Sequence, residues 1–235
     1  MALLTVPYRG IIFDFNGVLF FDSDLQEQAW QVVAGKLRGR EMTAAEFALH
    51  MHGRSNAYVL SYLAGREMRG PELAEWIDVK ESLFRNLCLT TPNRLLLSPG
   101  AQDLLESLAR AGIPRTIATS SGITNVKFFT EHLHLDRWFD VDRLVYDDGA
   151  RPGKPAPDMY LAAAGNIGVE PSRCVVVEDA ASGVAAAQAA GIGYIVGIGA
   201  SAGHAELLTS RGAALIIETL RDFPRERLAG LTPRQ

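Results

Sequence analysis

The chain has 235 residues, of which 48% are hydrophobic and 21% are charged, and its formal net charge is −4. This length allows one sizeable core together with a small accessory domain. No long basic run occurs, which argues against nucleic acid or an anionic membrane surface as the main partner.

The cysteines and the apolar segments bound the compartment. Cys88 and Cys174 lie far apart and lack CxxC spacing, which is typical of ordinary thiols in a reducing environment. The first ten residues are short and interrupted by Pro7, unlike a signal peptide, and no run of about 18 apolar residues predicts a membrane span. We therefore expect a soluble cytoplasmic protein, either a monomer or a weak dimer.

Five short apolar segments predict buried strands, at residues 10–15, 113–119, 174–179, 193–198 and 213–218. Continuous apolar strands of this kind are typical of a parallel sheet covered on both faces. The segments 101–112 and 180–191 between them have helical character, and each ends on a glycine that favours a helix stop. The alternation predicts an α/β fold with a doubly wound, Rossmann-like parallel sheet.

Residues 22–94 interrupt this alternation. Helical patterns cover residues 23–38, 43–50, 55–64 and 71–88, and no segment among them predicts a strand. The sequence therefore predicts an α/β core made of residues 1–20 and 95–235, with an inserted all-helical cap domain over residues 21–94.

Polar residues follow the predicted strands at their carboxyl ends. Ligands bind at this edge of open α/β sheets, where the strand order reverses, so residues far apart in sequence are expected to share one cleft. They are Asp14, Asn16, Thr119, Ser120, Glu178 and Asp179, joined by Lys154 from the loop before a later helix. Carboxylates can hold Mg²⁺, and lysine and hydroxyl groups can bind phosphoryl oxygens. A carboxylate can also attack phosphorus.

Each of these residues also has a simpler structural interpretation. Asp14 could cap a helix or form a turn, and Thr119 could be an ordinary strand residue. Lys154, taken alone, could be a solvated loop residue, and the acidic pair at 178–179 could cap the helix that follows. Residues 147–149 are interpreted as a surface turn without a chemical role.

Four motifs decide between these interpretations. They are DFNGVL (14–19), IATSS (117–121), GKPAP (153–157) and VEDAASG (177–183). In this order and at these spacings they resemble the haloacid dehalogenase-like hydrolase superfamily, in the branch that carries a helical cap after the first strand. Any one of the motifs alone would be a weak signal, but the four together are specific.

The resemblance implies roles for the matching residues. It implies catalytic roles for Asp14 as nucleophile, Asn16 and Lys154. It implies phosphate binding by Thr119, Ser120 and Lys154. It implies a Mg²⁺ site made by Asp14, the backbone carbonyl of Asn16, Glu178 and, chiefly, Asp179.

The predicted cap shows a weaker resemblance to the β-phosphoglucomutase-like branch. The segment HGRSN (52–56) is similar to one that contacts sugar phosphates there, which implies substrate binding by Gly53, Arg54 and Ser55. Asn56 stands where that branch usually has Arg, and Gln26 stands where it tends to have His. The natural substrate is therefore left open.

Position 16 departs from the family pattern, which has a second Asp that acts as general acid and base. An amide donates hydrogen bonds but does not exchange protons, and the loss of such a group typically lowers rates about 10²- to 10⁴-fold. Three explanations are open: a naturally slow enzyme, a substitute acid, or an introduced Asn. The substitutes that the sequence offers are Asp22, Asp24, His50 and His52.

The leading functional expectation is a Mg²⁺-dependent phosphatase for a small phosphorylated metabolite, such as a sugar phosphate. The alternatives are β-phosphoglucomutase-like phosphoryl transfer, a dehalogenase-type hydrolase, and a catalytically weak phosphate-binding regulator. The amide at position 16 favours substrates with good leaving groups. On sequence grounds alone, Asn16→Asp is expected to raise turnover.

Overall fold

A computed structural model of the protein describes residues 8–51, 53–199 and 201–231. Within these residues, six parallel strands form one sheet in the order β3-β2-β1-β4-β5-β6. The strands are β1 (Gly10–Phe13), β2 (Arg115–Gly122), β3 (Val145–Asp147), β4 (Cys174–Glu178), β5 (Tyr194–Ile198) and β6 (Leu215–Ile217). The chain runs outward from β1 to β3, returns to β4 beside β1, and runs outward again to β6. The strand order therefore reverses at β1, where a ligand site is expected.

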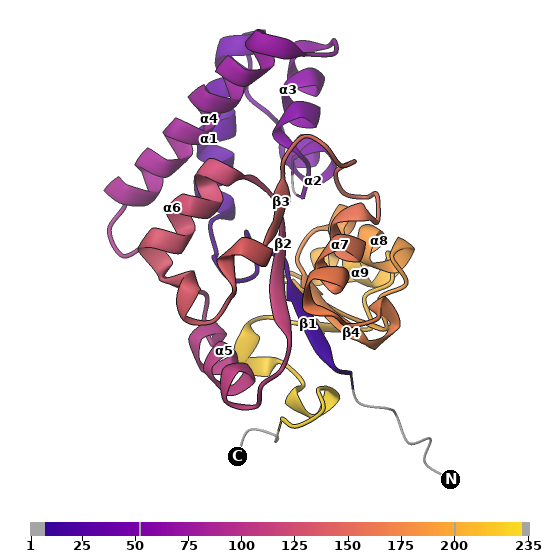
Figure 1. Ribbon diagram of the computed structural model, residues 1–235. Helices are drawn as coiled ribbons and strands as arrows, with labels where there is room; N and C mark the ends of the chain where they lie inside the picture. The colour runs from indigo at the N-terminus through magenta and orange to yellow at the C-terminus, as the bar shows by residue number, and fades with distance from the viewer. Residues whose placement is uncertain (1–7, 52, 200, 232–235) are drawn as a thin grey trace.

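Successive residues of β1 point to opposite faces of the sheet, and both faces are covered. Ile11 and Phe13 belong to an apolar cluster with α5 (Ala101–Arg110) and α6 (Ile123–Leu133). Ile12 belongs to a second cluster with α7 (Asp158–Ile167), α8 (Ala181–Ala189) and α9 (Ala202–Ser210). In Figure 1, α5 and α6 lie to the left of the strands and α7, α8 and α9 to the right. Burial on both faces explains why β1 and the first four residues of β4 are apolar, up to Glu178 at the end of β4.

Four helices between β1 and α5 make the helical insert, at the top of Figure 1. They are α1 (Ser23–Arg38), α2 (Ala44–His50), α3 (Asn56–Ala64) and α4 (Gly70–Thr90). The insert has its own apolar core, which includes Trp30, Phe47 and Leu60. Its helices have local start and stop signals, such as the capping box between Thr43 and Glu46 at the start of α2. The predicted α/β fold with an inserted all-helical unit is confirmed.

The sheet differs from the prediction in one strand. Residues 147–149 were expected to be only a surface turn, but Val145–Asp147 forms β3 beside β2. The turn follows the strand, with the amide of Gly149 donating to Oδ1 of Asp147 at 3.0 Å. A three-residue edge strand in which only Val145 is buried carries too little apolar signal to be recognised from sequence.

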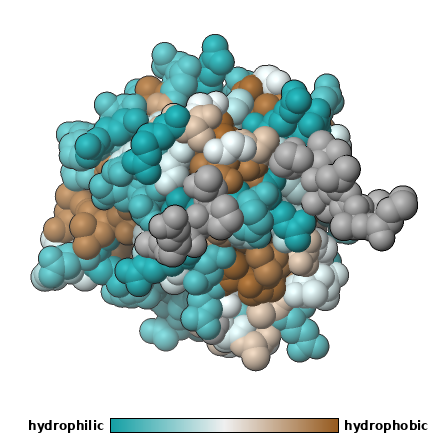
Figure 2. Space-filling model, turned by 90° about the horizontal axis from the view of Figure 1, so that it is seen from below, coloured by the Kyte–Doolittle hydropathy of each residue, from teal (hydrophilic) through white to brown (hydrophobic). Residues whose placement is uncertain are grey.

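Figure 2 views the molecule from the side opposite the insert. In Figure 2 the brown residues that are visible form separate patches among hydrophilic ones. Within the described part of the chain, no helix is long and apolar enough to cross a membrane.

Candidate active site

The loop after β1 places Asp14 at the centre of the sheet's carboxyl edge. The amide of Asp14 donates to the carbonyl of Val177 on β4 at 2.9 Å, which continues the ladder one residue beyond β1. Phe15 and Leu19 are buried and anchor the loop. Gly17 has a φ of 76°, and a Cβ there would lie 2.0 Å from Oδ2 of Asp179. Glycine therefore allows both the turn and the close approach of Asp179.

Lys154 joins two of the acidic side chains. Its ammonium donates to Oδ1 of Asp14 at 2.8 Å and to Oε1 of Glu178 at 2.9 Å. All three residues are buried. The ammonium also lies 5.1 Å from the centre of the Tyr160 ring. The lysine predicted from the GKPAP motif thus lies beside the predicted nucleophile.

Asp14, Glu178 and Asp179 form a group that could hold a cation. One carboxylate oxygen from each lies within 4.8 Å of the others. Oε2 of Glu178 also accepts from the backbone amide of Asp179 at 2.9 Å, so Asp14 and Asp179 have more freedom to bind a metal directly. Three carboxylates face one ammonium, and oxygen donors with excess negative charge fit a hard divalent cation such as Mg²⁺.

The same crowding shifts the acidity of these groups. Burial, and then the neighbouring Glu178, raise the pKa of Asp14 to about 7 against the opposing effect of Lys154. Burial and the charge of Glu178 raise the pKa of Asp179 well above its usual value. Burial alone would lower the pKa of Lys154, but Asp14 and Glu178 outweigh it and hold that pKa well above normal. Without a cation, the raised pKa values mean that Asp14 and Asp179 keep their protons to a higher pH than an ordinary Asp, while Lys154 stays charged.

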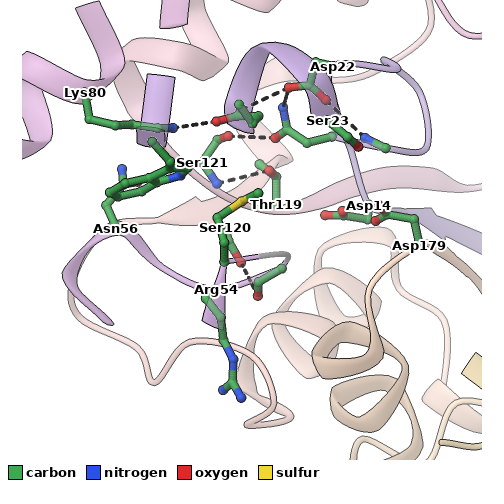
Figure 3. Close-up of a pocket in the computed structure, with 16 residues that line it drawn as sticks. Asp14, Asp22, Ser23, Arg54, Asn56, Lys80, Thr119, Ser120, Ser121 and Asp179 are labelled. Atoms are coloured by element: carbon green, nitrogen blue, oxygen red, sulfur yellow. Dashed lines mark hydrogen bonds between the residues drawn. The ribbon is translucent and has the colours of Figure 1, made fainter. Parts of the chain in front are cut away.

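Strand β2 brings hydroxyl groups to the same cleft. Thr119, Ser120 and Ser121 line it together with Asp14 and Asp179 (Figure 3). The hydroxyl of Thr119 accepts from the amide of Ser121 at 3.1 Å. The hydroxyl of Ser120 is 3.4 Å from the carbonyl of Gly53, to which it donates. The predicted phosphate ligands on β2 thus lie opposite the acidic group.

Asn16 is fixed by two neighbours. Its amide nitrogen donates to Oδ2 of Asp22 at 2.6 Å, and its amide oxygen accepts from the hydroxyl of Ser121 at 2.9 Å. Asp22 is fully buried and also lines the cleft. Burial raises the pKa of Asp22 to about 6, against the opposing hydrogen bonds from Gln26 and Asn16.

A family model described as haloacid dehalogenase-like hydrolase matches residues 8–191. The chain belongs to this family. It is 30% identical over 218 residues to the phosphorylated carbohydrates phosphatase of Thermotoga maritima, an alignment that covers 89% of this chain and 94% of the relative. It is 29% identical over 240 residues to the β-phosphoglucomutase of Mycobacterium tuberculosis, covering 92% of this chain and 91% of the relative.

A solved structure supports the same assignment. The crystal structure of a HAD hydrolase, family IA, variant 3, from Entamoeba histolytica superposes with a TM-score of 0.82 at 36% identity, and covers 93% of this chain and 96% of that chain. The family and the fold expected from the four motifs are therefore confirmed, and the protein is a HAD-like hydrolase.

The predicted substrate segment of this hydrolase is placed only in part at the cleft. Gly53 and Arg54 line the cleft, and the guanidinium of Arg54 is 3.4 Å from the carbonyl of Lys154, to which it donates. Ser55 is instead the N-cap of α3, where its hydroxyl accepts from the amide of Tyr58 at 3.4 Å. A hydroxyl in this capping role is less available to a substrate.

Sequence reasoning missed a second group of cleft residues. Gln26, Asn56 and Lys80 line the cleft, and Glu81 connects two of them; we call these four the insert network. Lys80 donates to Oε1 of Gln26 at 2.6 Å and to Oε1 of Glu81 at 3.0 Å. Asn56 donates to the same Oε1 of Glu81 at 2.7 Å. Gln26 was noticed only as a departure from a family pattern. Adjacent charged residues in a helix give no signal that both are buried.

The four residues that could replace the missing acid at position 16 differ in where the structure places them. Asp22 lines the cleft. Asp24 is exposed and pairs with Arg94. His50 stacks on Tyr62 with 4.0 Å between ring centres, and its Nδ1 is 2.8 Å from the hydroxyl of Tyr58. His52 lies outside the described residues.

Proposed function

We propose that this HAD-like hydrolase is a Mg²⁺-dependent phosphatase of a small phosphorylated metabolite, with Asp14 as the nucleophile. The observation that carries the proposal is the convergence of Asp14 and Asp179 with the β2 hydroxyl groups in one cleft, where the buried Lys154 donates to Asp14. The T. maritima relative, whose name is that of a phosphatase of phosphorylated carbohydrates, supports a sugar phosphate as the substrate class.

The chemistry assigned to these residues has two steps. An oxygen of Asp14 attacks phosphorus, and the bond from phosphorus to the leaving oxygen breaks to give an aspartyl-phosphate. Water then attacks the phosphorus, which releases inorganic phosphate and restores the carboxylate. Lys154, Thr119 and Ser120 bind the phosphoryl oxygens and stabilise their charge in both steps.

Mg²⁺ fits the donors of this site. Asp14, Asp179 and the backbone carbonyl of Asn16 would hold it, with Glu178 as a further ligand, directly or through water. When bound, the ion would offset the negative charge that the carboxylates and the substrate bring together.

The helical insert is proposed to be a cap domain made of residues 21–94. Residues 1–20 and 95–235 would then form the catalytic core. Gly53 and Arg54 would contact the substrate from the cap side, and the insert network would shape the rest of its pocket. Closure of the cap over the cleft would keep bulk water from the phosphoryl group.

Release of inorganic phosphate from a panel of phosphorylated sugars and smaller metabolites, with and without Mg²⁺, tests the proposal. We expect turnover only with the metal, and loss of turnover in Asp14→Asn. Turnover that persists in Asp14→Asn, or that ignores Mg²⁺ removal, would contradict the assignment of the nucleophile or of the metal.

A second candidate is phosphoryl transfer to another substrate hydroxyl. It is favoured by the amide at position 16, which cannot take a proton from water, and by the relative that is named as a β-phosphoglucomutase. A phosphorylated form of the protein that persists in water, and decays faster when a sugar phosphate is added, would favour transfer over hydrolysis.

A further inference from the structure

Asp22 stands at the N-cap of α1, yet its side chain does not cap that helix. The carboxylate makes no cap hydrogen bond, although Asp is among the preferred N-cap residues. It points toward the cleft, where Figure 3 shows it above Thr119 and Ser121. The cap interaction is given up for contacts on the side of the active site.

Three donors converge on this carboxylate. The amide nitrogen of Asn16 donates to Oδ2 at 2.6 Å, the amide nitrogen of Gln26 donates to Oδ2 at 3.0 Å, and the backbone amide of Gly17 donates to Oδ1 at 3.3 Å. An ionised carboxylate accepts hydrogen bonds and donates none, so it matches this set. It also fixes which end of the Asn16 side chain is nitrogen, because an oxygen at that end would face another acceptor.

The other end of the Asn16 side chain is fixed by Ser121, whose hydroxyl donates to the amide oxygen at 2.9 Å. An amide nitrogen has two N–H bonds, and Asp22 uses one. Among the described residues the structure gives the second N–H no partner, and Asn16 lines the cleft. That N–H is therefore available to an oxygen of the substrate.

We infer that Asp22 is a positioning residue that holds Asn16 as a fixed hydrogen-bond donor to the phosphoryl or leaving-group oxygen. The inference rests on the proposed function and adds that positions 16 and 22 are a matched amide–carboxylate pair. A carboxylate at position 16 would lie against that of Asp22 in a buried site, where like charges repel strongly. The amide of Asn16 therefore complements the carboxylate of Asp22. The expectation from the sequence is revised accordingly: Asn16→Asp alone should raise turnover less than Asn16→Asp combined with Asp22→Asn.

A double-mutant cycle tests the pairing without any need for activity. The proteins are the wild type, Asn16→Asp, Asp22→Asn and the double variant, and the readout is the melting temperature in EDTA. We expect Asn16→Asp to lower the melting temperature by several degrees in the wild type and by much less in the Asp22→Asn background. Non-additivity is the signature of direct contact.

Asn86→Asp is the control for added charge, because Asn86 is exposed on α4 and its substitution should leave the melting temperature unchanged. Equal losses for Asn16→Asp in both backgrounds would overturn the inference. If Asn16→Asp fails to fold, folding of the double variant supports the pairing, and its failure beside a folded Asp22→Asn overturns it.

Turnover supplies the readout that a merely structural role would not move. The double variant carries an acid at position 16 without the facing carboxylate, so hydrolysis of a simple alkyl phosphate should rise about tenfold or more over the wild type. The single variant Asn16→Asp should gain less, and a single variant that matches or exceeds the double overturns the inference. If no variant hydrolyses any phosphate ester, the proposed phosphatase function fails, while the melting temperatures still decide the pairing.

Discussion

The two sides of the cleft hold their charges in different ways. On the core side, the strand-end cluster of Asp14, Lys154, Glu178 and Asp179 carries three carboxylates against one ammonium. On the insert side, Lys80 and Glu81 pair one for one. The remaining polar groups of the insert network, Gln26 and Asn56, donate to or accept from these partners. Of these two groups, the strand-end cluster is the one whose excess negative charge favours the binding of a cation.

This difference in charge balance suggests a division of roles, with the chemical step on the core side and the shape of the substrate pocket on the insert side. The strand-end cluster is unfavourable on its own, which is typical of sites where acidity is adjusted for catalysis. The insert network satisfies itself, so we expect its substitution to disturb stability and substrate choice before it disturbs the chemical step. Substitutions on the two sides of the cleft should therefore differ in their effects on turnover and on stability.

Asp14→Asn should have opposite effects on activity and on stability. Removal of the nucleophile should lower turnover by at least about 10³-fold. In EDTA the same variant should melt at a higher temperature than the wild type, because one of three crowded carboxylates is gone. Asp24→Asn, which removes an exposed carboxylate on α1, is the control and should change neither quantity much. A variant of position 14 that loses stability in EDTA would show that the cluster is not strained by its own charge.

Lys80→Met should show the reverse balance, with a large loss of stability. The Lys80 side chain is 3% exposed, and its ammonium pairs with the Glu81 side chain, which is 9% exposed. Removing one partner of a buried pair typically costs about 3 to 5 kcal/mol because the other charge is left buried. The ammonium also lies 5.1 Å from the ring centres of Trp30 and Phe84, and these contacts would be lost.

The exposed pair of Arg66 and Glu72 offers a matched control for Lys80. Arg66→Met should change the free energy of unfolding by no more than about 1 kcal/mol in urea titrations. If Lys80→Met were as mild as this control, the insert network would not be the buried, self-satisfied unit described above.

The core side of the cleft was predictable from sequence and the insert network was not, for a physical reason. Asp14, Thr119, Lys154 and Asp179 stand at strand ends or in loops that a parallel sheet brings to one edge whatever the rest of the chain does. Their positions therefore follow from the topology of the parallel sheet, and the short apolar segments of the sequence predict that sheet. The strand β3 escaped because three residues, only one of them buried, leave almost no pattern.

The insert network depends on how helices pack, which no local pattern reveals. Lys80 meets Gln26 across 54 positions of the chain, because α4 packs on α1. Asn125 on α6 donates to Glu81 from the core side. Asp22 was recognised as a candidate acid, but its pairing with Asn16 depends on a loop that folds back after β1. Such contacts join residue types that are ordinarily exposed, so burial has to be seen before they can be assigned a role.

The smallest expected effect concerns pH and completes the contrast. The pKa of Asp14 is raised to about 7 and that of Asp22 to about 6, both by burial, from the usual value of 3.8. Between about pH 4 and pH 7 the folded state therefore holds protons that the unfolded state has released. The contribution of these groups to stability is greatest at low pH and declines as pH rises through this window.

Melting curves in EDTA at pH 5 and pH 8 measure this decline, and the difference between the wild type and Asp14→Asn isolates the part that belongs to Asp14. We expect that variant to gain a few degrees over the wild type at pH 8 and little at pH 5.

Mg²⁺ competes with protons for the ionised carboxylates, so it should stabilise the wild type more at pH 8 than at pH 5, and Asp14→Asn less than the wild type at both. The insert network contains no acid with a raised pKa, and Lys80 and Glu81 already compensate each other. Variants of the insert network leave the strand-end cluster intact, so they should keep the wild-type stabilisation by Mg²⁺ at both pH values. A loss of that stabilisation as large as in Asp14→Asn would mean that the excess negative charge is not confined to the strand ends.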